Sequence, residues 1–342
     1  MIVELALKSE RKMARELIEA SGLAFEDNVD VMYGMYENER LVATGSRAGN
    51  ILKMLALAPD HQGGSALGEL VTELVMSGQR AGHDSLFVYT KPEFIFSFQS
   101  LNFTLLASQE KVALLEYGKG LSKWLDSKRG LVRPGLNGAV VVNCNPFTNG
   151  HLYLIESAAR RVDNLYIFVV KEDRSVFPFD VRYRLVEEGV RHIPNVIQLD
   201  TSRYIVSGAT FPTYFLKKDD PVARIQMELD VTLFASKIAP FFGITRRFVG
   251  TEPNCPLTGG YNLAMQRILP AHGIELKIIE RKQAETGVIS ASKVRELVGK
   301  GDFAGLADYV PPTTRAFLES DEAQVIRERL QSDFSNKTLT GC

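Results

Sequence analysis

Apolar and polar positions alternate differently in the two parts of the chain. Residues 1–127 contain short apolar runs, such as Val31–Tyr36 and Leu41–Gly45, which polar turns join as in antiparallel hairpins. From Ala139 onward, apolar runs alternate regularly with segments of helical spacing. Because parallel strands need crossover connections, this alternation predicts a parallel sheet with helices on both faces. We therefore expect an α/β protein in which a mixed α/β domain precedes a Rossmann-like domain.

Five strands and five helices are expected in the second domain. The predicted strands are Ala139–Asn143, Leu165–Val170, Val196–Leu199, Arg247–Gly250 and Glu275–Glu280, and the predicted helices are Gly150–Arg161, Phe179–Arg191, Pro221–Ala239, Tyr261–Leu269 and Ala291–Val298. Sheets of this kind bind ligands in a crevice at the carboxyl ends of their strands. Residues that directly follow a predicted strand are therefore the first candidates for a functional site.

The domain limits follow from length and local composition. With 342 residues, the chain exceeds one ordinary hydrophobic core, and about two domains are expected. Residues 128–138 hold three glycines and one proline, which favours a linker. We predict a first domain over residues 1–127, a second over 139–320, and a C-terminal helix and tail over 321–342.

The composition excludes several classes of function. Lys and Arg number 40 and Asp and Glu 41, so no overall charge favours nucleic acid or an anionic membrane. No apolar run approaches the ~18–20 residues that span a bilayer, and the first residues do not resemble a signal peptide. The three cysteines form no CxxC pair, which argues against a disulfide framework and a zinc site. We expect a cytoplasmic protein without a nucleic-acid or membrane partner.

The strongest indication of chemistry lies in Asn143–His151, directly after the first strand of the second domain. A proline-containing turn reverses the chain, and a helix is expected to begin at Gly150. Glycine lets a ligand approach the backbone closely, and the free N–H groups of a helix start attract phosphate. His151 lies in the first turn, where it can donate a hydrogen bond to a phosphate oxygen. The alternative is that Thr148 and Asn149 merely cap a surface helix.

A second group of donors begins the last predicted helix. Ser290 is expected to cap this helix, and Ser292 lies in its first turn. Arg295 follows about one turn further along. Hydroxyls and a guanidinium at a helix start can form another phosphate site. Taken alone, the segment is more typical of a capped surface helix.

Together, the two motifs resemble those of the HIGH-type nucleotidyltransferases. The superfamily motifs, His/Thr-x-Gly-His and Ile-Ser-x-Ser/Thr-x-x-Arg, correspond to Thr148–His151 and Ile289–Arg295. The chain also resembles the citrate lyase ligase family in six blocks, which are Asn145–His151, Glu172–Phe179, Ser207–Pro212, Gly250–Pro253, Tyr261–Asn262 and Ile289–Ser292. It departs from that family's pattern at Lys293, where a small hydroxyl residue is expected, and at Thr251, where an acidic one is expected.

The resemblance implies an ATP-dependent acetate ligase. Acetate would attack the α-phosphorus of ATP, pyrophosphate would leave, and acetyl-adenylate would form. The thiol of a CoA-like prosthetic group on the acyl carrier subunit of citrate lyase would then take the acetyl group and release AMP. ATP is thus an expected substrate, with Mg²⁺ as a partner of its phosphates. A carboxylate is already ionised near pH 7, so the first step needs positioning and charge neutralisation rather than a strong base.

The resemblance also implies roles for individual residues. Catalytic roles are expected for Thr148, His151 and Arg295. Contacts to ATP and its phosphates are expected from residues of both motifs and from one residue after a later strand, namely Asn145, Phe147, Gly150, His151, Ser290, Ser292, Arg295 and Glu252. For Glu252, the alternatives are that it binds the ribose hydroxyls or that it simply ends a strand.

The charged loop after the second strand of this domain offers further candidates. Lys171 and Arg174 can meet phosphate or acetate, although a solvated charged loop is an equally good interpretation. Arg182, on the following helix, can point toward the substrate or away from it. Cys144 lies beside the first motif without an obvious base, so we expect a small buried residue rather than a nucleophile.

Part of the first domain resembles the GNAT acetyltransferases. Met54–Ser65 is similar to the strand, loop and helix start that hold the pyrophosphate of acetyl-CoA in that family, and Phe98 and Asn102-Phe103 are similar to a later segment. The glycine positions of the loop are only partly kept, so we expect no independent acetyltransferase activity. One hypothesis is that this domain binds the CoA-like arm of the carrier protein, and the alternative is a domain that serves packing and docking.

Two other functions share the motifs. An adenylyltransferase that joins AMP to a phosphorylated acceptor, such as a pantetheine or pyridine nucleotide, uses the same two motifs. Only the family-like blocks outside them favour acetate. The other possibility is a non-catalytic sensor of a nucleotide or CoA. A sensor has no need to stabilise a transition state, so intact Thr148, His151, Ser290 and Arg295 argue against it.

Overall fold

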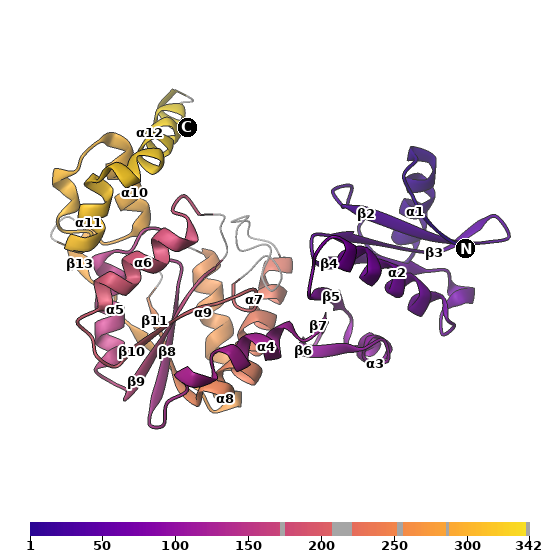
Figure 1. Ribbon diagram of the computed structural model, residues 1–342, viewed down its shortest axis with the longest axis horizontal. Helices are drawn as coiled ribbons and strands as arrows, with labels where there is room; N and C mark the ends of the chain where they lie inside the picture. The colour runs from indigo at the N-terminus through magenta and orange to yellow at the C-terminus, as the bar shows by residue number, and fades with distance from the viewer. Residues whose placement is uncertain (172–174, 207–220, 252–255, 285–286, 340–342) are drawn as a thin grey trace. The chain divides into compact units, whose positions relative to one another are not determined.

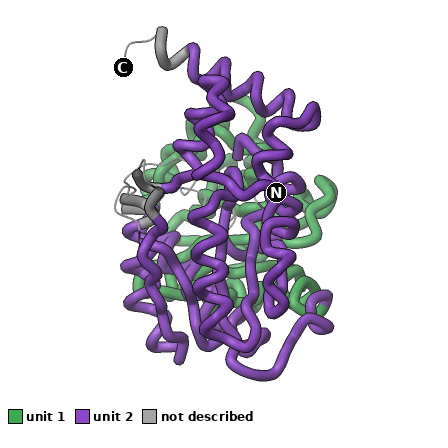
Figure 2. The backbone as a smooth tube through the Cα atoms, turned by 90° about the vertical axis from the view of Figure 1, so that its left-hand side faces the viewer, with its two compact units in different colours: residues 1–126 green, residues 127–342 purple. Residues whose placement is uncertain are grey.

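The computed structural model describes residues 1–171, 175–206, 221–251, 256–284 and 287–339. It divides into two compact units, Met1–Asp126 and Ser127–Cys342, each with its own sheet and its own core (Figure 1 and Figure 2). The finer domain limits that we derive from the sequence stay a prediction.

The first unit is a seven-stranded sheet with a helix on each face. In sheet order its strands are β1 (Ile2–Glu4), β2 (Val31–Glu37), β3 (Arg40–Ala48), β4 (Ile51–Leu57), β5 (Leu86–Thr90), β7 (Val112–Tyr117) and β6 (Phe103–Gln109). Successive residues of a strand face opposite sides of the sheet. Met32 therefore packs in the core shared with α1 (Lys8–Ala20), and Tyr33 packs in the core shared with α2 (Ala66–Arg80). The predicted mixed α/β class is confirmed for this part of the chain.

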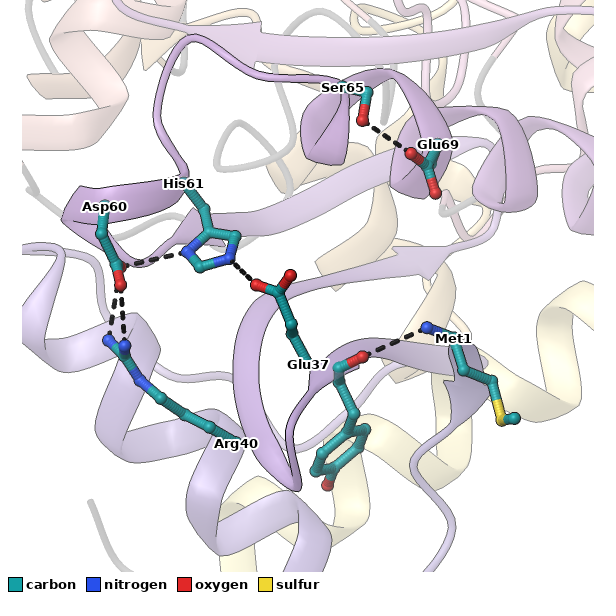
Figure 3. A network of polar contacts seen from close by, with 8 residues as sticks. Met1, Glu37, Arg40, Asp60, His61, Ser65 and Glu69 are labelled. Atoms are coloured by element: carbon teal, nitrogen blue, oxygen red, sulfur yellow. Dashed lines mark hydrogen bonds and ion pairs between the residues drawn. The ribbon is translucent and has the colours of Figure 1, made fainter.

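A network of polar side chains holds the loop between β4 and α2 (Figure 3). Nδ1 of His61 lies 3.1 Å from Asp60, and its Nε2 lies 2.5 Å from Glu37. These hydrogen bonds, led by that to Glu37, raise the pKa of His61. Where α2 starts, Ser65 Oγ donates to Glu69 at 2.7 Å. Glu69 thus lies at the helix start where the GNAT resemblance places a pyrophosphate, and the binding of a CoA-like arm there stays a prediction.

The second unit contains a five-stranded parallel sheet. In sheet order its strands are β10 (Val196–Asp200), β9 (Asn164–Val169), β8 (Asn137–Val142), β11 (Ile244–Gly250) and β12 (Glu275–Ile279). The chain runs outward from β8 to β9 and β10, then returns to place β11 on the other side of β8. Strand order therefore reverses between β8 and β11, where such folds bind ligands. The predicted Rossmann-like sheet is confirmed.

Helices cover both faces of this sheet. The helices that follow β8 are α5 (Asn149–Ala159), α6 (Phe179–Val190), α7 (Pro221–Leu233), α8 (Ala239–Phe242), α9 (Pro256–Ile268), α10 (Ala291–Lys300), α11 (Pro312–Glu319) and α12 (Gln324–Leu339). Of these, α11 packs on α6 and α12 packs on α10. Ile167 on β9 packs in the core shared with α5, α6 and α10. Its neighbour Phe168 faces the other side, with its ring centroid 5.9 Å from that of Phe234 and 5.8 Å from that of Phe242. The alternation that predicted the sheet thus also separates its two faces.

Most predicted elements of the second unit differ from the structure by one or two residues, and three differ by more. Helix α9 begins at Pro256, five residues before its predicted start at Tyr261. The helix expected over Pro221–Ala239 is interrupted, because α7 ends at Leu233 and a π-helical segment, Phe234–Ile238, precedes α8. Pro240 explains the interruption, since proline has no N–H for the regular helical hydrogen bond and crowds the preceding turn. Strand β11 begins at Ile244, three residues before the predicted start at Arg247.

Candidate active site

A cavity of about 550 Å³ lies at the carboxyl ends of β8, β11 and β12. Its walls include Asn143 at the end of β8 and Gly250 at the end of β11, on either side of the point where strand order reverses. Residues of both sequence motifs line it, namely Thr148, Gly150, His151, Ser290, Ala291 and Ser292. The two helix starts that were expected to face one crevice therefore do so.

The first motif fixes the orientation and the protonation of His151. Thr148 is the N-cap of α5, and its Oγ1 accepts a hydrogen bond from the backbone N–H of His151 at 3.3 Å. In return, the backbone N–H of Thr148 donates to Nδ1 of His151 at 3.1 Å. Since Nδ1 accepts this bond, the neutral ring carries its proton on Nε2. Thr148 thus positions a histidine whose Nε2–H can be donated to a ligand.

The ring of His151 lies on the side chain of Phe147. The two ring centroids are 6.0 Å apart and the ring planes differ by 14°. Phe147 itself is fully buried in the core of the second unit. We expected Phe147 to contact ATP, but in this structure it supports His151 from behind and has no surface to offer a ligand.

His151 is neutral near pH 7. Burial, together with the positive charge of Arg281, lowers its pKa to about 4. Desolvation penalises the imidazolium, and a nearby cation penalises it further. The ring is therefore a neutral hydrogen-bond donor and not a cation, and its contact with phosphate stays a prediction.

This shift predicts a pH dependence of stability. The unfolded chain binds a proton at His151 near the ordinary pKa of 6.5, whereas the folded chain does so only near pH 4. The contribution of the neutral ring to the free energy of unfolding is therefore fully present above about pH 6.5 and is lost as the pH falls toward 4. Relative to His151→Asn, which does not titrate, wild type should lose roughly 1–3 kcal/mol of unfolding free energy between pH 7 and pH 4.5. Urea denaturation at both pH values measures this difference, and equal losses in the two proteins would contradict the shift.

A glycine behind Phe147 keeps this arrangement in place. A Cβ atom at Gly189 on α6 would lie 2.3 Å from Cε1 of Phe147. Gly189→Ala should therefore displace Phe147 and His151 and cost about 1–3 kcal/mol of stability, together with most of the activity. The matched control is Gly260→Ala on α9, where the nearest atom, Sδ of Met227, would be 3.4 Å away. Thermal unfolding of the two variants tests this, and equal melting temperatures would argue against a close-packed support.

The second motif is bound directly to the first. Ser290 caps α10 and accepts a hydrogen bond from the backbone N–H of Lys293 at 3.2 Å. Arg295 donates from Nη2 to Ser292 Oγ at 3.0 Å and from Nη1 to the carbonyl oxygen of Asn145 at 2.5 Å. The capping by Ser290 is as predicted. Arg295 joins the two motifs, and its direct contact with phosphate stays a prediction.

Close packing also brings the two motifs together. A Cβ atom at Gly150 would lie 3.3 Å from the carbonyl oxygen of Ile289. That is tighter than an ordinary side-chain contact, so glycine permits the starts of α5 and α10 to approach each other. Asn145 contributes in a different way, because its Oδ1 accepts the backbone N–H of Phe177 at 3.1 Å. Gly150 lines the cavity, whereas Asn145 does not and instead holds the backbone at Phe177, just before α6.

Arg182 does not line the cavity. Its side chain is fully buried, and Nη1 donates to the carbonyl oxygens of Asn143 at 2.9 Å and Val170 at 2.7 Å. Nε donates to the carbonyl oxygen of Phe177 at 2.9 Å. The expectation that Arg182 belongs to a substrate loop is therefore replaced by a role in joining the ends of β8 and β9. Cys144 is buried as expected, and burial raises the pKa of its thiol.

Of the remaining predicted site residues, Lys171 lies within the described residues, whereas Arg174 and Glu252 do not. The backbone N–H of Lys171 donates to Thr201 Oγ1 at 2.9 Å, and its ammonium lies 5.9 Å from the ring centroid of Phe179. Within the described ranges, no cluster of three or more His, Cys, Asp or Glu side chains could hold a metal ion. Nor does any described helix combine the length and apolar character that crossing a membrane requires.

Two arginines that line the cavity were not among the site residues that we predicted from the sequence. Arg281 follows β12, and its Nε donates to the carbonyl oxygen of Thr251 at 2.6 Å. Arg247 lies within β11, where its side chain is only 3% exposed. A signal for Arg247 was present, because a charged residue inside a strand that is covered on both faces must be buried.

Comparison with known proteins agrees with this architecture. The family model described as citrate lyase ligase C-terminal domain matches residues 137–318. The [Citrate [pro-3S]-lyase] ligase of Escherichia coli (strain K12) is 37% identical over 324 residues, which are 92% of this chain and 92% of that protein.

Two further matches are more limited. Phosphopantetheine adenylyltransferase of Streptococcus gordonii is 43% identical over 54 residues, 15% of this chain and 33% of that protein. A solved putative acetyltransferase of the GNAT family from Desulfovibrio desulfuricans is 13% identical, with 34% of this chain and 96% of that chain covered and a TM-score of 0.29. The family model and the full-length relative decide the assignment: the chain belongs to the citrate lyase ligase family.

Proposed function

We propose that this chain is an ATP-dependent acetate ligase that activates citrate lyase. It would acetylate the thiol of the CoA-like prosthetic group on the acyl carrier subunit of that enzyme. The observation that carries the proposal is the meeting of two helix starts, capped by Thr148 and Ser290, in one cavity of a chain from the citrate lyase ligase family.

The reaction has two steps. A carboxylate oxygen of acetate forms a bond to the α-phosphorus of ATP, and the bond to pyrophosphate breaks, which yields acetyl-adenylate. The carrier thiol then attacks the acetyl carbonyl carbon, AMP leaves with the electron pair of the broken C–O bond, and the thiol proton is released. The first step places no demand on a strong base, because the acid is already ionised.

The protein contributes donors that are fixed before the substrate arrives. The backbone N–H groups at the starts of α5 and α10, with Nε2–H of His151, would bind the phosphate oxygens on which charge develops. Ser292 adds a hydroxyl to the same wall. We expect Mg²⁺ to arrive on the triphosphate and to supply positive charge there, since the described side chains form no metal cluster of their own.

The adenylyltransferase alternative is less favoured. Likeness to phosphopantetheine adenylyltransferase extends over 15% of the chain, whereas likeness to the ligase extends over 92%. A non-catalytic sensor is disfavoured as well, because the donors of Thr148, His151 and Ser290 are oriented in one cavity.

Exchange of labelled pyrophosphate into ATP tests the proposal. The purified chain with Mg²⁺ should catalyse this exchange when acetate is present and not when it is absent. Acetylation of the carrier thiol, with AMP formed in equal amount, should follow when citrate lyase acyl carrier protein is added. Exchange that requires a phosphorylated acceptor in place of acetate would establish the adenylyltransferase. ATP binding without turnover, even with the carrier protein present, would establish the sensor.

A further inference from the structure

Arg247 is a buried cation with unused hydrogen-bond donors. It lies on β11, lines the cavity, and its side chain is 3% exposed. Among the described residues, its Nε and Nη1 atoms have no hydrogen-bond partner. The guanidinium lies 4.7 Å from the ring centroid of Phe234, which supports the cation but accepts no conventional hydrogen bond. Buried polar groups are normally paired, so unpaired donors that border a cavity indicate a ligand.

The carboxylate of Asp230, near Arg247, accepts hydrogen bonds from other residues. Asp230 is fully buried, and its Oδ1 accepts the backbone N–H of Val206 at 2.7 Å. Its Oδ2 accepts the hydroxyl of Tyr261 at 2.5 Å. Burial lowers the pKa of Arg247 to about 10, while Tyr261 and Asp230 oppose this shift, so the guanidinium remains charged near pH 7. Asp230 thus stabilises the charge of Arg247 without accepting a hydrogen bond from its Nε or Nη1.

Residues with apolar surface also line the cavity that Arg247 borders. Val206, Tyr261 and Met265 line the same cavity, and the last two lie one turn apart on α9. Val206 has a positive φ of 47°, which is rare for a β-branched residue, and its N–H bond to Asp230 holds it there. A cavity that offers both a cation and apolar surface suits a small anion with a short alkyl group.

Position separates Arg247 from the phosphate donors. Arg247 precedes Gly250, the last residue of β11, by three residues, which is about 10 Å along a strand. In the neighbouring strand it pairs with Ala139, well before the motif that starts at Asn143. The triphosphate has its donors at the helix starts, whereas Arg247 lies deeper along the sheet.

We infer that Arg247 binds the carboxylate of the acid substrate and orients it for attack on the α-phosphorus. One carboxylate oxygen accepts from the guanidinium, and the other remains free to form the bond to phosphorus. This assignment rests on the proposed ligase function. The phosphate of the carrier's CoA-like arm is the other anion that such a site could take, and the experiment separates the two.

The test compares Arg247→Met with Arg246→Met in pyrophosphate exchange without carrier protein. Arg246 is the preceding residue of β11 and is paired with Glu275 at 3.1 Å. Loss of a charged hydrogen-bond partner should raise the KM for acetate roughly 10- to 100-fold in Arg247→Met, with the KM for ATP changed less than about 2-fold. Arg246→Met should keep both values.

Stability and direct binding distinguish a ligand site from a structural one. Arg247→Met keeps the aliphatic stem, and Asp230 keeps its hydrogen bonds to Val206 and Tyr261, so the melting temperature should stay close to that of wild type. Saturation-transfer NMR with acetate should detect binding to wild type and to Arg246→Met, and lose it in Arg247→Met. A lower melting temperature with unchanged acetate binding would overturn the inference.

Other outcomes separate this inference from the proposed function. Equal increases in the KM for acetate and ATP, or a defect confined to transfer onto the carrier protein, would overturn the carboxylate assignment while leaving the ligase intact. If wild type showed no acetate-dependent exchange, the ligase function would fail. The NMR comparison would then still test the role of Arg247. Acetate that binds to wild type but not to Arg247→Met would support the site, and acetate that does not bind to wild type would reject it.

Discussion

Replacing His151 by alanine is expected to lower the rate of acetate-dependent pyrophosphate exchange by about 10²–10³-fold. The reason is the fixed orientation of the ring, whose Nδ1 accepts the backbone N–H of Thr148 and whose Nε2–H is left for the ligand. A donor that is held in place before binding needs no reorganisation when charge develops on the phosphate. The loss should appear mainly in kcat, because the interaction strengthens as that charge grows.

The matched control is another histidine of the same unit. His192 is largely exposed, and its Nε2 lies 3.0 Å from Oε1 of Glu156. It belongs to neither motif. His192→Ala should exchange pyrophosphate at the wild-type rate. Near-wild-type turnover of His151→Ala, with a normal melting temperature, would remove His151 from the reaction. If His151→Ala instead matched Gly189→Ala in both exchange rate and destabilisation, the loss would be attributed to packing.

Local sequence was enough to predict the two motif helices. Capping by Thr148 and Ser290 depends on residues three positions apart, and each helix follows a strand in a regular alternation. The parallel sheet follows from the same alternation, because crossover connections permit few arrangements. The reversal of strand order then placed both helix starts at one cavity, as the sequence interpretation required.

Side-chain burial was less predictable than the fold. Phe147 belongs to the motif by position, yet long-range packing against Gly189 turns it into the support of His151. Arg182 follows a charged loop, and only the folded chain shows that carbonyl groups from three segments surround its guanidinium. One sequence alone indicates which residues can bind an anion, but burial and pairing decide which of them do.

Arg247 is a residue whose burial could have been predicted from the sequence. We predicted the strand that begins at this residue but did not consider its charge. A strand interior in a sheet covered on both faces is apolar by default, so an arginine there carries a desolvation cost that demands a partner. The structure assigns it an aromatic neighbour and a cavity, and among the described residues its Nε and Nη1 remain unpaired.

Arg182→Met is expected to destabilise the second unit strongly. Methionine keeps part of the aliphatic volume but supplies no donor, so the carbonyl oxygens of Asn143, Val170 and Phe177 lose the hydrogen bonds of the guanidinium inside the core. Buried acceptors that lose a charged donor in this way cost about 3–5 kcal/mol in total. The melting temperature should therefore fall by about 10 °C.

The control for this variant lies two residues further along α6. Arg184 is partly exposed and pairs with Glu322 at 2.6 Å, so Arg184→Met should cost less than about 1 kcal/mol. Because Arg182 holds the segment that leads into the first motif, the surviving folded fraction of Arg182→Met should also exchange pyrophosphate more slowly, with KM values for ATP and acetate raised together. A wild-type melting temperature combined with a rise in the KM for acetate alone would restore Arg182 to the substrate loop, since only direct contact with the acid could act on that one constant.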